Sequence, residues 1–122
     1  MPAGDNPSRK VVSFFAHPGR DARDAAWKSL HEDPAWQKAL AESEKDGPLI
    51  DSSIATLMRT TAYSPAFDAA QTARPRVVEL RTYRTTPGNL GALNARFRDH
   101  TVKLFGKHGM TNLVYWHLAP GS

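Results

Sequence analysis

The sequence predicts an α+β fold in which helices cover one face of a small antiparallel sheet. Its 122 residues suit one globular domain with a moderate core. Segments rich in β-branched and aromatic residues alternate with segments rich in Ala, Lys and Leu. Their order is β-α-β, a linker, and β-α-β again, which favours a four-stranded sheet.

The first predicted strand is Lys10–His17, with the sequence KVVSFFAH. Its β-branched and aromatic residues favour an extended chain, and Pro18-Gly19 ends it. The second predicted strand is Ile50–Arg59, because its side chains alternate between two chemically different faces.

Between these strands, a run rich in Ala, Lys, Glu and Leu predicts two helices. Asp33 is a good helix cap, and Pro34 behind it suits the first helical position. The predicted helices are therefore about Arg20–Glu32 and Pro34–Lys45, and Gly47-Pro48 stops the second.

A linker, residues 62–75, separates the second half of the chain. Arg76–Thr85 is the third predicted strand. Asn89 can cap a helix from Leu90 to about Gly106, and Met110–Leu118 is the fourth predicted strand.

Two β-α-β units in one domain predict the ferredoxin-like arrangement, a four-stranded antiparallel sheet with helices on one face. The opposite face stays uncovered, and an apolar sheet face usually needs a partner. We therefore expect the chain to form a homodimer through this face.

Composition excludes several classes of function. The chain has no Cys, which rules out disulfides, thiolate zinc sites, iron–sulfur clusters and a cysteine nucleophile. We find no membrane span and no secretory signal, so a cytoplasmic location is expected. Residues 66–122 carry eight basic and three acidic side chains, but without interleaved aromatic residues nucleic-acid binding is the weakest hypothesis.

No nucleophile elbow, phosphate-binding loop, dinucleotide fingerprint or metal motif is present. Only two histidines, His100 and His108, fall near one helix, and helical rise separates them by about 12 Å, too far for one ion. The others are His17, His31 and His117. We therefore expect no metal and no cofactor.

The best candidate site is on the third predicted strand. If Val78 and Leu80 pack on the helices, the alternate residues point to the uncovered face, where they either form an interfacial ion pair that sets dimer register or line a ligand-binding or catalytic cavity. Residues of the last strand and one helical histidine could join them. The candidate cavity residues are Glu79, Arg81, Tyr83, His100, Tyr115, Trp116 and His117.

Both halves of the chain resemble parts of the NIPSNAP domain. Residues 76–118 resemble its first half, through the motifs ELRTY (79–83), Pro87-Gly88, RFRDH (96–100), LFGKHGM (104–110) and Tyr115-Trp116. Residues 9–65 resemble its second half, through the motifs SFFAHP (13–18), AWK (26–28), DPAWQ (33–37), ESE (42–44) and YSP (63–65). We read residues 1–122 as one such domain with the halves in reversed order.

The reversed order has three possible origins: a circular permutation, a piece of a tandem-domain protein, or a shortened descendant of one. In chain numbering the expected strand order becomes 2-3-1-4, and the linker is long enough for the sheet to close within one chain. Exchange of halves between two chains would give a domain-swapped oligomer instead.

The resemblance implies a dimeric α+β barrel. It also implies a non-enzymatic interaction or structural module of unassigned biochemical role, because family members in eukaryotes associate with proteins, membranes or organelle surfaces. The wider barrel group includes cofactor-free monooxygenases, so a small-molecule-binding protein or such an enzyme, using the cavity between sheets, is the alternative.

Overall fold

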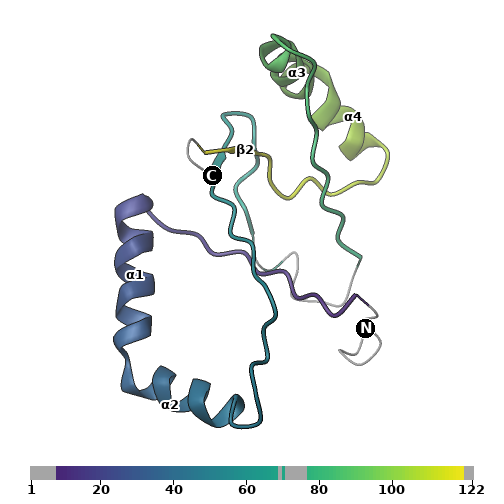
Figure 1. Ribbon diagram of the computed structural model, residues 1–122. Helices are drawn as coiled ribbons and strands as arrows, with labels where there is room; N and C mark the ends of the chain where they lie inside the picture. The colour runs from purple at the N-terminus through teal and green to yellow at the C-terminus, as the bar shows by residue number, and fades with distance from the viewer. Residues whose placement is uncertain (1–7, 69, 71–76, 120–122) are drawn as a thin grey trace. The chain divides into compact units, whose positions relative to one another are not determined.

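The computed structural model describes residues 8–68, 70 and 77–119 (Figure 1). The chain divides into two compact units, the first ending at Ser53 and the second beginning at Ile54. The first unit carries two helices, and the second carries a helical run and a small antiparallel sheet. An α+β composition is therefore confirmed.

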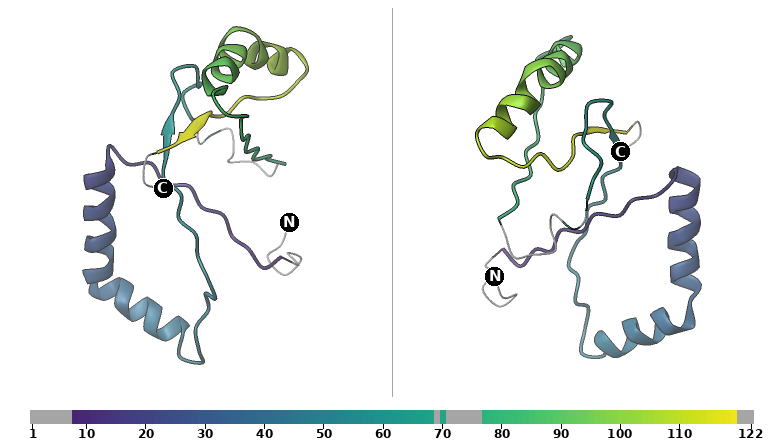
Figure 2. Two further views of the ribbon diagram at one scale, coloured as in Figure 1. Left: turned by 45° about the horizontal axis from the view of Figure 1, so that its top comes forward. Right: turned by 180° about the vertical axis from the view of Figure 1, so that it is seen from behind.

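The helices of the first unit are α1, Arg20–Glu32, and α2, Pro34–Ser43. They meet at a bend around Asp33 (Figure 2), whose side-chain oxygen accepts a 2.9 Å hydrogen bond from the backbone N–H of Ala35. This is the predicted cap, and it satisfies a donor that the helix itself leaves unpaired. The second helix ends two residues earlier than predicted.

An aromatic contact joins the extended segment 10–17 to α1. The ring of Phe15 lies edge-on to that of Trp27, with their centroids 5.6 Å apart. In an extended chain, adjacent side chains point to opposite sides. Val12 and Phe14 therefore project to the side opposite Phe15, and all three side chains are exposed.

The helical run of the second unit confirms the predicted third helix. It consists of α3, Leu90–Arg96, then a π-helical turn η3, Phe97–Thr101, and α4, Val102–Lys107. No pattern in the sequence predicts the π-helical turn. It begins at Phe97, which has only 5% of its surface exposed and is the most deeply buried apolar residue among those described.

The small sheet (Figure 2) pairs β1, Met58–Thr60, with β2, Trp116–Leu118, in antiparallel orientation. In its register Arg59 lies opposite His117. Further backbone hydrogen bonds of 3.0 Å extend the pairing, from Thr61 N–H to the Tyr115 carbonyl and from Ala119 N–H to the Leu57 carbonyl.

The strand predictions need two corrections. Lys10–His17 and the described part of Arg76–Thr85 are not strands, and the other two predicted strands form only at their C-terminal ends. A strand requires hydrogen bonds to a neighbour, so β-branched composition alone gives an extended segment. The expected 2-3-1-4 order is also wrong for the described pair, because it places 50–59 and 110–118 at opposite edges, whereas β1 and β2 are neighbours.

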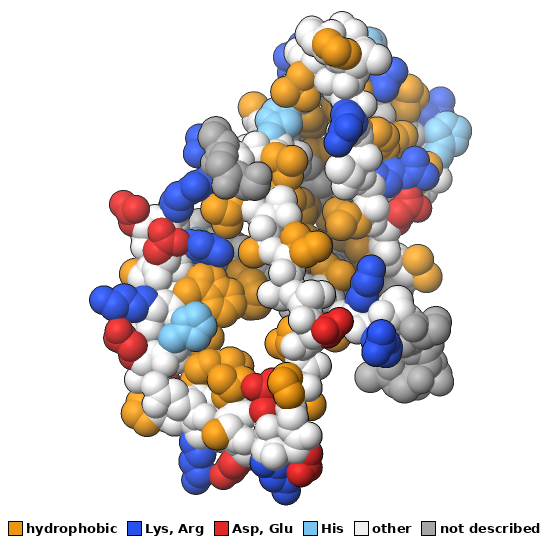
Figure 3. Space-filling model, viewed as in Figure 1, with side chains coloured by type: hydrophobic (Ala, Val, Ile, Leu, Met, Phe, Trp, Pro, Cys, Tyr) orange, Lys and Arg blue, Asp and Glu red, His pale blue; other side chains and the backbone are white. Residues whose placement is uncertain are grey.

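Buried side chains are few in the described part of the chain. Those with less than a tenth of their surface exposed are Thr61, Phe97 and Ala119. Large apolar side chains remain open in both units (Figure 3), among them Val12, Val77 and Leu80. Across the described residues, none of the helices has the length and apolar character needed to cross a membrane.

Candidate functional site

Four aromatic rings gather at the centre of the second unit. Phe97 stacks on Tyr63 with centroids 5.9 Å apart, and it contacts Tyr83 at 5.5 Å and Tyr115 at 5.3 Å. We call these four residues the aromatic cluster. They come from the loop after β1, the segment before α3, the π-helical turn and the segment before β2, so the cluster links four separate segments of this unit.

A polar network surrounds the aromatic cluster. The Tyr63 hydroxyl donates a 2.9 Å hydrogen bond to Oδ1 of Asn94, and His117 Nε2 lies 2.8 Å from the same oxygen. Because an amide oxygen only accepts hydrogen bonds, this geometry places a hydrogen on Nε2 of the imidazole. One amide thus fixes both a phenol and a histidine from β2.

A second set of hydrogen bonds anchors Tyr115. Its hydroxyl donates to Oδ1 of Asn112, whose Nδ2 donates a 3.0 Å bond to the carbonyl of Val102. Its backbone N–H donates a 2.9 Å bond to the hydroxyl oxygen of Ser64. The loop after β1, the helical run and the segment before β2 are therefore tied together at this residue.

Burial raises the pKa of both Tyr63 and Tyr115 above the ordinary phenol value, since the charged phenolate is poorly solvated there. At neutral pH these hydroxyls are neutral hydrogen-bond donors. They can orient a neighbouring group, but they do not supply a phenolate base.

The predicted site residues fall into two groups. Tyr83, Tyr115 and His117 come together in the cluster and its network. Trp116 lies in β2 opposite Thr60, and His100 is exposed on the π-helical turn.

Glu79 and Arg81 form an ion pair that is exposed to solvent, and the bond to the carboxylate raises the pKa of the guanidinium. The alternation pattern predicts Tyr83 on the face away from the helices, together with this pair. The structure shows its ring against Phe97 of the helical run instead. In an extended segment this places the alternate residues, Val78 and Leu80, on the opposite side.

Sequence reasoning missed Tyr63, Asn94 and Asn112 as parts of the site. The YSP motif marks only a resemblance in the sequence, yet Tyr63 and Ser64 both form hydrogen bonds with distant residues of the cluster region. Nothing in the sequence marks the two asparagines, because an amide shows its partners only after folding.

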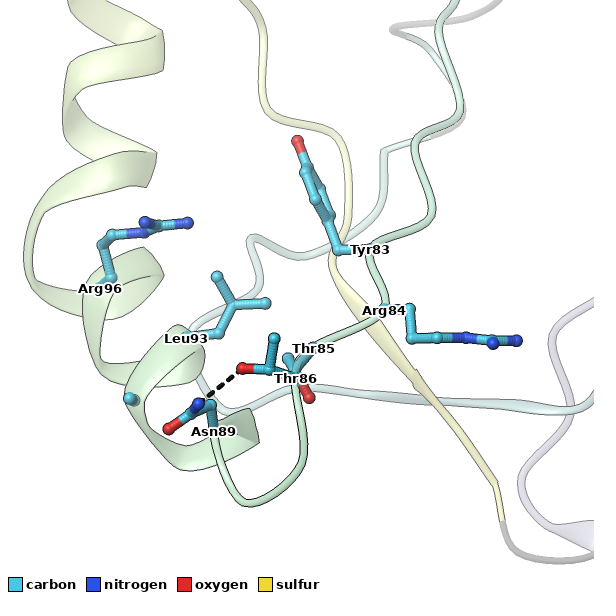
Figure 4. Close-up of a pocket in the computed structure, with 8 residues that line it drawn as sticks. Tyr83, Arg84, Thr85, Thr86, Asn89, Leu93 and Arg96 are labelled. Carbon is cyan, nitrogen blue, oxygen red and sulfur yellow. Dashed lines mark hydrogen bonds between the residues drawn. The ribbon is translucent and has the colours of Figure 1, made fainter.

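An open hollow of about 450 Å³ lies beside the cluster, between α3 and the segment that precedes it (Figure 4). Its walls include Tyr83, Thr85, Thr86, Asn89, Leu93 and Arg96. Asn89 Nδ2 donates a 2.6 Å hydrogen bond to Thr86 Oγ1, which fixes the turn at the base of the hollow.

Comparison with known proteins assigns the chain to a family. The NIPSNAP family model matches residues 4–65, just over half of the chain. The chain belongs to the NIPSNAP family. No curated protein and no solved structure matches it.

The NIPSNAP match coincides with the segment whose motifs resemble the second half of the family domain. It covers α1, α2 and β1 and ends at Pro65, directly after the cluster residue Tyr63 and its neighbour Ser64. The assignment of residues 76–118 to the first half, and with it the reversed order, remains a prediction.

The described part of this NIPSNAP chain contains no cluster of side chains suited to bind a metal ion. Within that part, no group of three or more His, Asp or Glu side chains is placed so that it could hold a metal ion. The groups that the site does offer are phenols, amides, one imidazole and arginines.

Proposed function

We propose that this NIPSNAP chain is a non-enzymatic assembly module. In this proposal the extended segments 10–17 and 77–85 add to the β1–β2 pair to complete a four-stranded sheet. The face that the helices leave open then mates with a second copy to form a dimeric α+β barrel. Closure within one chain and exchange of segments between two chains both lead to such a dimer.

One observation carries the proposal: strand-type segments of both units expose large apolar side chains. Val12 is 70% exposed, and Val78 and Leu80 are 55% and 63% exposed. Full burial of one such side chain stabilises a structure by roughly 2 kcal/mol. Extended segments of this kind also carry backbone groups that favour pairing with another strand. Assembly is the process that would satisfy both requirements.

The exposed Glu79–Arg81 pair lies outside the proposed mating face, because alternation in an extended segment puts both residues on the same side as Tyr83, which packs against the helical run. In solvent such a pair contributes little to stability. The pair therefore carries no part of the assembly proposal.

The experiment compares two neighbouring lysine substitutions by light scattering. Val12→Lys places a charge on the side opposite Phe15 and should convert a dimer into a species of the 13.5 kDa chain mass. Ser13→Lys adds the same charge on the other side and should leave the dimer intact. A wild-type monomer, or equal behaviour of the two variants, would refute assembly through this face.

A further inference from the structure

The hollow beside α3 has an unusual charge balance. Arginines are its charged side chains, and none of its described lining residues is acidic. Neighbouring arginines are neutralised, since Arg98 pairs with Asp99 and Arg81 with Glu79. Among the described residues, Arg96 takes part in no such ion pair. The hollow therefore presents an uncompensated positive charge.

The two arginines of the hollow are placed differently. Figure 4 shows the side chain of Arg96 extending from α3 toward the space beside Tyr83, whereas Arg84 points away from it. A single guanidinium thus faces the space. One planar guanidinium matches one carboxylate through two parallel hydrogen bonds.

The remaining walls supply a second donor and an apolar surface. Thr86 Oγ1 accepts the hydrogen bond from Asn89, which leaves the Thr86 hydroxyl hydrogen for another acceptor. Leu93 and the Tyr83 ring form the apolar part of the wall. A volume of about 450 Å³ is within the range of small-molecule sites.

We propose that this hollow binds a small monocarboxylate with an apolar body, of about the size of benzoate. Arg96 would hold the carboxylate, the Thr86 hydroxyl would donate to it, and Leu93 with the Tyr83 ring would cover the body. Inorganic phosphate fits less well, because it offers no apolar surface and carries more charge than one guanidinium compensates. The proposal goes beyond assembly, since every contact comes from one unit of one chain.

The test is a titration of the full chain, followed by the NMR shifts of its amide and methyl groups. Benzoate is the probe, and benzyl alcohol and inorganic phosphate are the matched comparisons. We expect the largest benzoate shifts at Thr86 and Leu93, with weaker binding of both comparison compounds. Since the hollow is open, the dissociation constant should be on the order of millimolar.

Two arginine variants sharpen the test. Arg96→Ala should weaken benzoate binding about tenfold or more, because a charge-assisted pair of hydrogen bonds is lost. Arg98→Ala removes the same charge two residues away and should change the affinity less than about twofold. Arg96→Lys should give an intermediate affinity, because it keeps the charge without the planar fork.

Several results would overturn the proposal. They are benzoate shifts outside the hollow, no shifts at all, binding of benzyl alcohol or phosphate as tight as that of benzoate, and equal losses in the alanine variants. Wild-type shift mapping decides the location even if a variant fails to fold. Repeating the titration on Val12→Lys separates this site from assembly, since loss of the dimer should leave benzoate binding in place.

Discussion

Phe97 organises the second unit at the level of single residues. It is 5% exposed and touches three tyrosine rings from three different segments. Aromatic pairs add about 0.5–1.5 kcal/mol beyond the area they bury. We therefore expect Phe97 to contribute more to the free energy of unfolding than any other single side chain in the described core.

Replacement of Phe97 by Ala should lower the free energy of unfolding by about 3–5 kcal/mol, the cost of a cavity at a buried ring. Chemical denaturation measures this loss. Phe67→Ala is the matched control, because that ring is 52% exposed, and it should cost well under 1 kcal/mol. Equal losses in the two variants would show that the cluster is not the core.

The tyrosines of the cluster predict a pH dependence. Burial raises the folded-state pKa of Tyr63 and Tyr115 above the value near 10 that they have in the unfolded chain. Their contribution is fully present below about pH 10 and is lost as the pH rises through the folded values, because the unfolded chain ionises first.

Stability should therefore fall above about pH 10, and phenolate absorbance should show part of the tyrosine ionising late. Denaturation midpoints measured across the alkaline range test the first statement. Tyr115→Phe should weaken the alkaline dependence. A variant with the unchanged dependence of the wild type would contradict the assignment to this phenol.

Only part of the candidate site could be predicted from the sequence. Tyr83, Tyr115 and His117 were identified because aromatic and titratable residues on predicted strands stand out. Asn94 could not be identified, because its importance depends on Tyr63 and His117, which the folded chain brings to its side-chain oxygen. The side of the segment on which Tyr83 packs depends on tertiary contacts. The alternation pattern alone predicts the wrong side, because the ring packs against Phe97 of the helical run.

At the level of elements, helices followed the sequence more closely than strands. Two adjacent residues, Asp33 and Pro34, determine the start of α2, and the structure shows the predicted capping hydrogen bond. Strands depend on neighbours distant in sequence, so of Ile50–Arg59 only the end forms β1. The π-helical turn at Phe97 follows no local rule that the sequence displays.

The Asp33 cap gives the prediction at this scale. Asp33→Ala should lower the free energy of unfolding by about 1 kcal/mol and reduce helical circular dichroism, because the Ala35 N–H loses its acceptor. Asp51→Ala removes an exposed aspartate from the same unit outside the helices and should have little effect. A larger loss from Asp51→Ala than from Asp33→Ala would contradict the capping account.

At the level of the whole molecule, the exposure of large apolar side chains is the main argument for assembly. Family membership rests on residues 4–65, whose described members expose or only partly cover their side chains apart from Thr61. Segments 10–17 and 77–85 have the composition of sheet strands, but neither belongs to the described two-stranded sheet. Several of their large apolar side chains are exposed. The proposed assembly into a larger sheet would account for the short sheet that a sequence with strong strand signals forms by itself.

The mass of the full chain in solution tests this central claim most directly. Light scattering at tens of micromolar protein should give twice the 13.5 kDa chain mass, because the open strand segments would then be covered by a second copy. A stable monomer under the same conditions would contradict the claim.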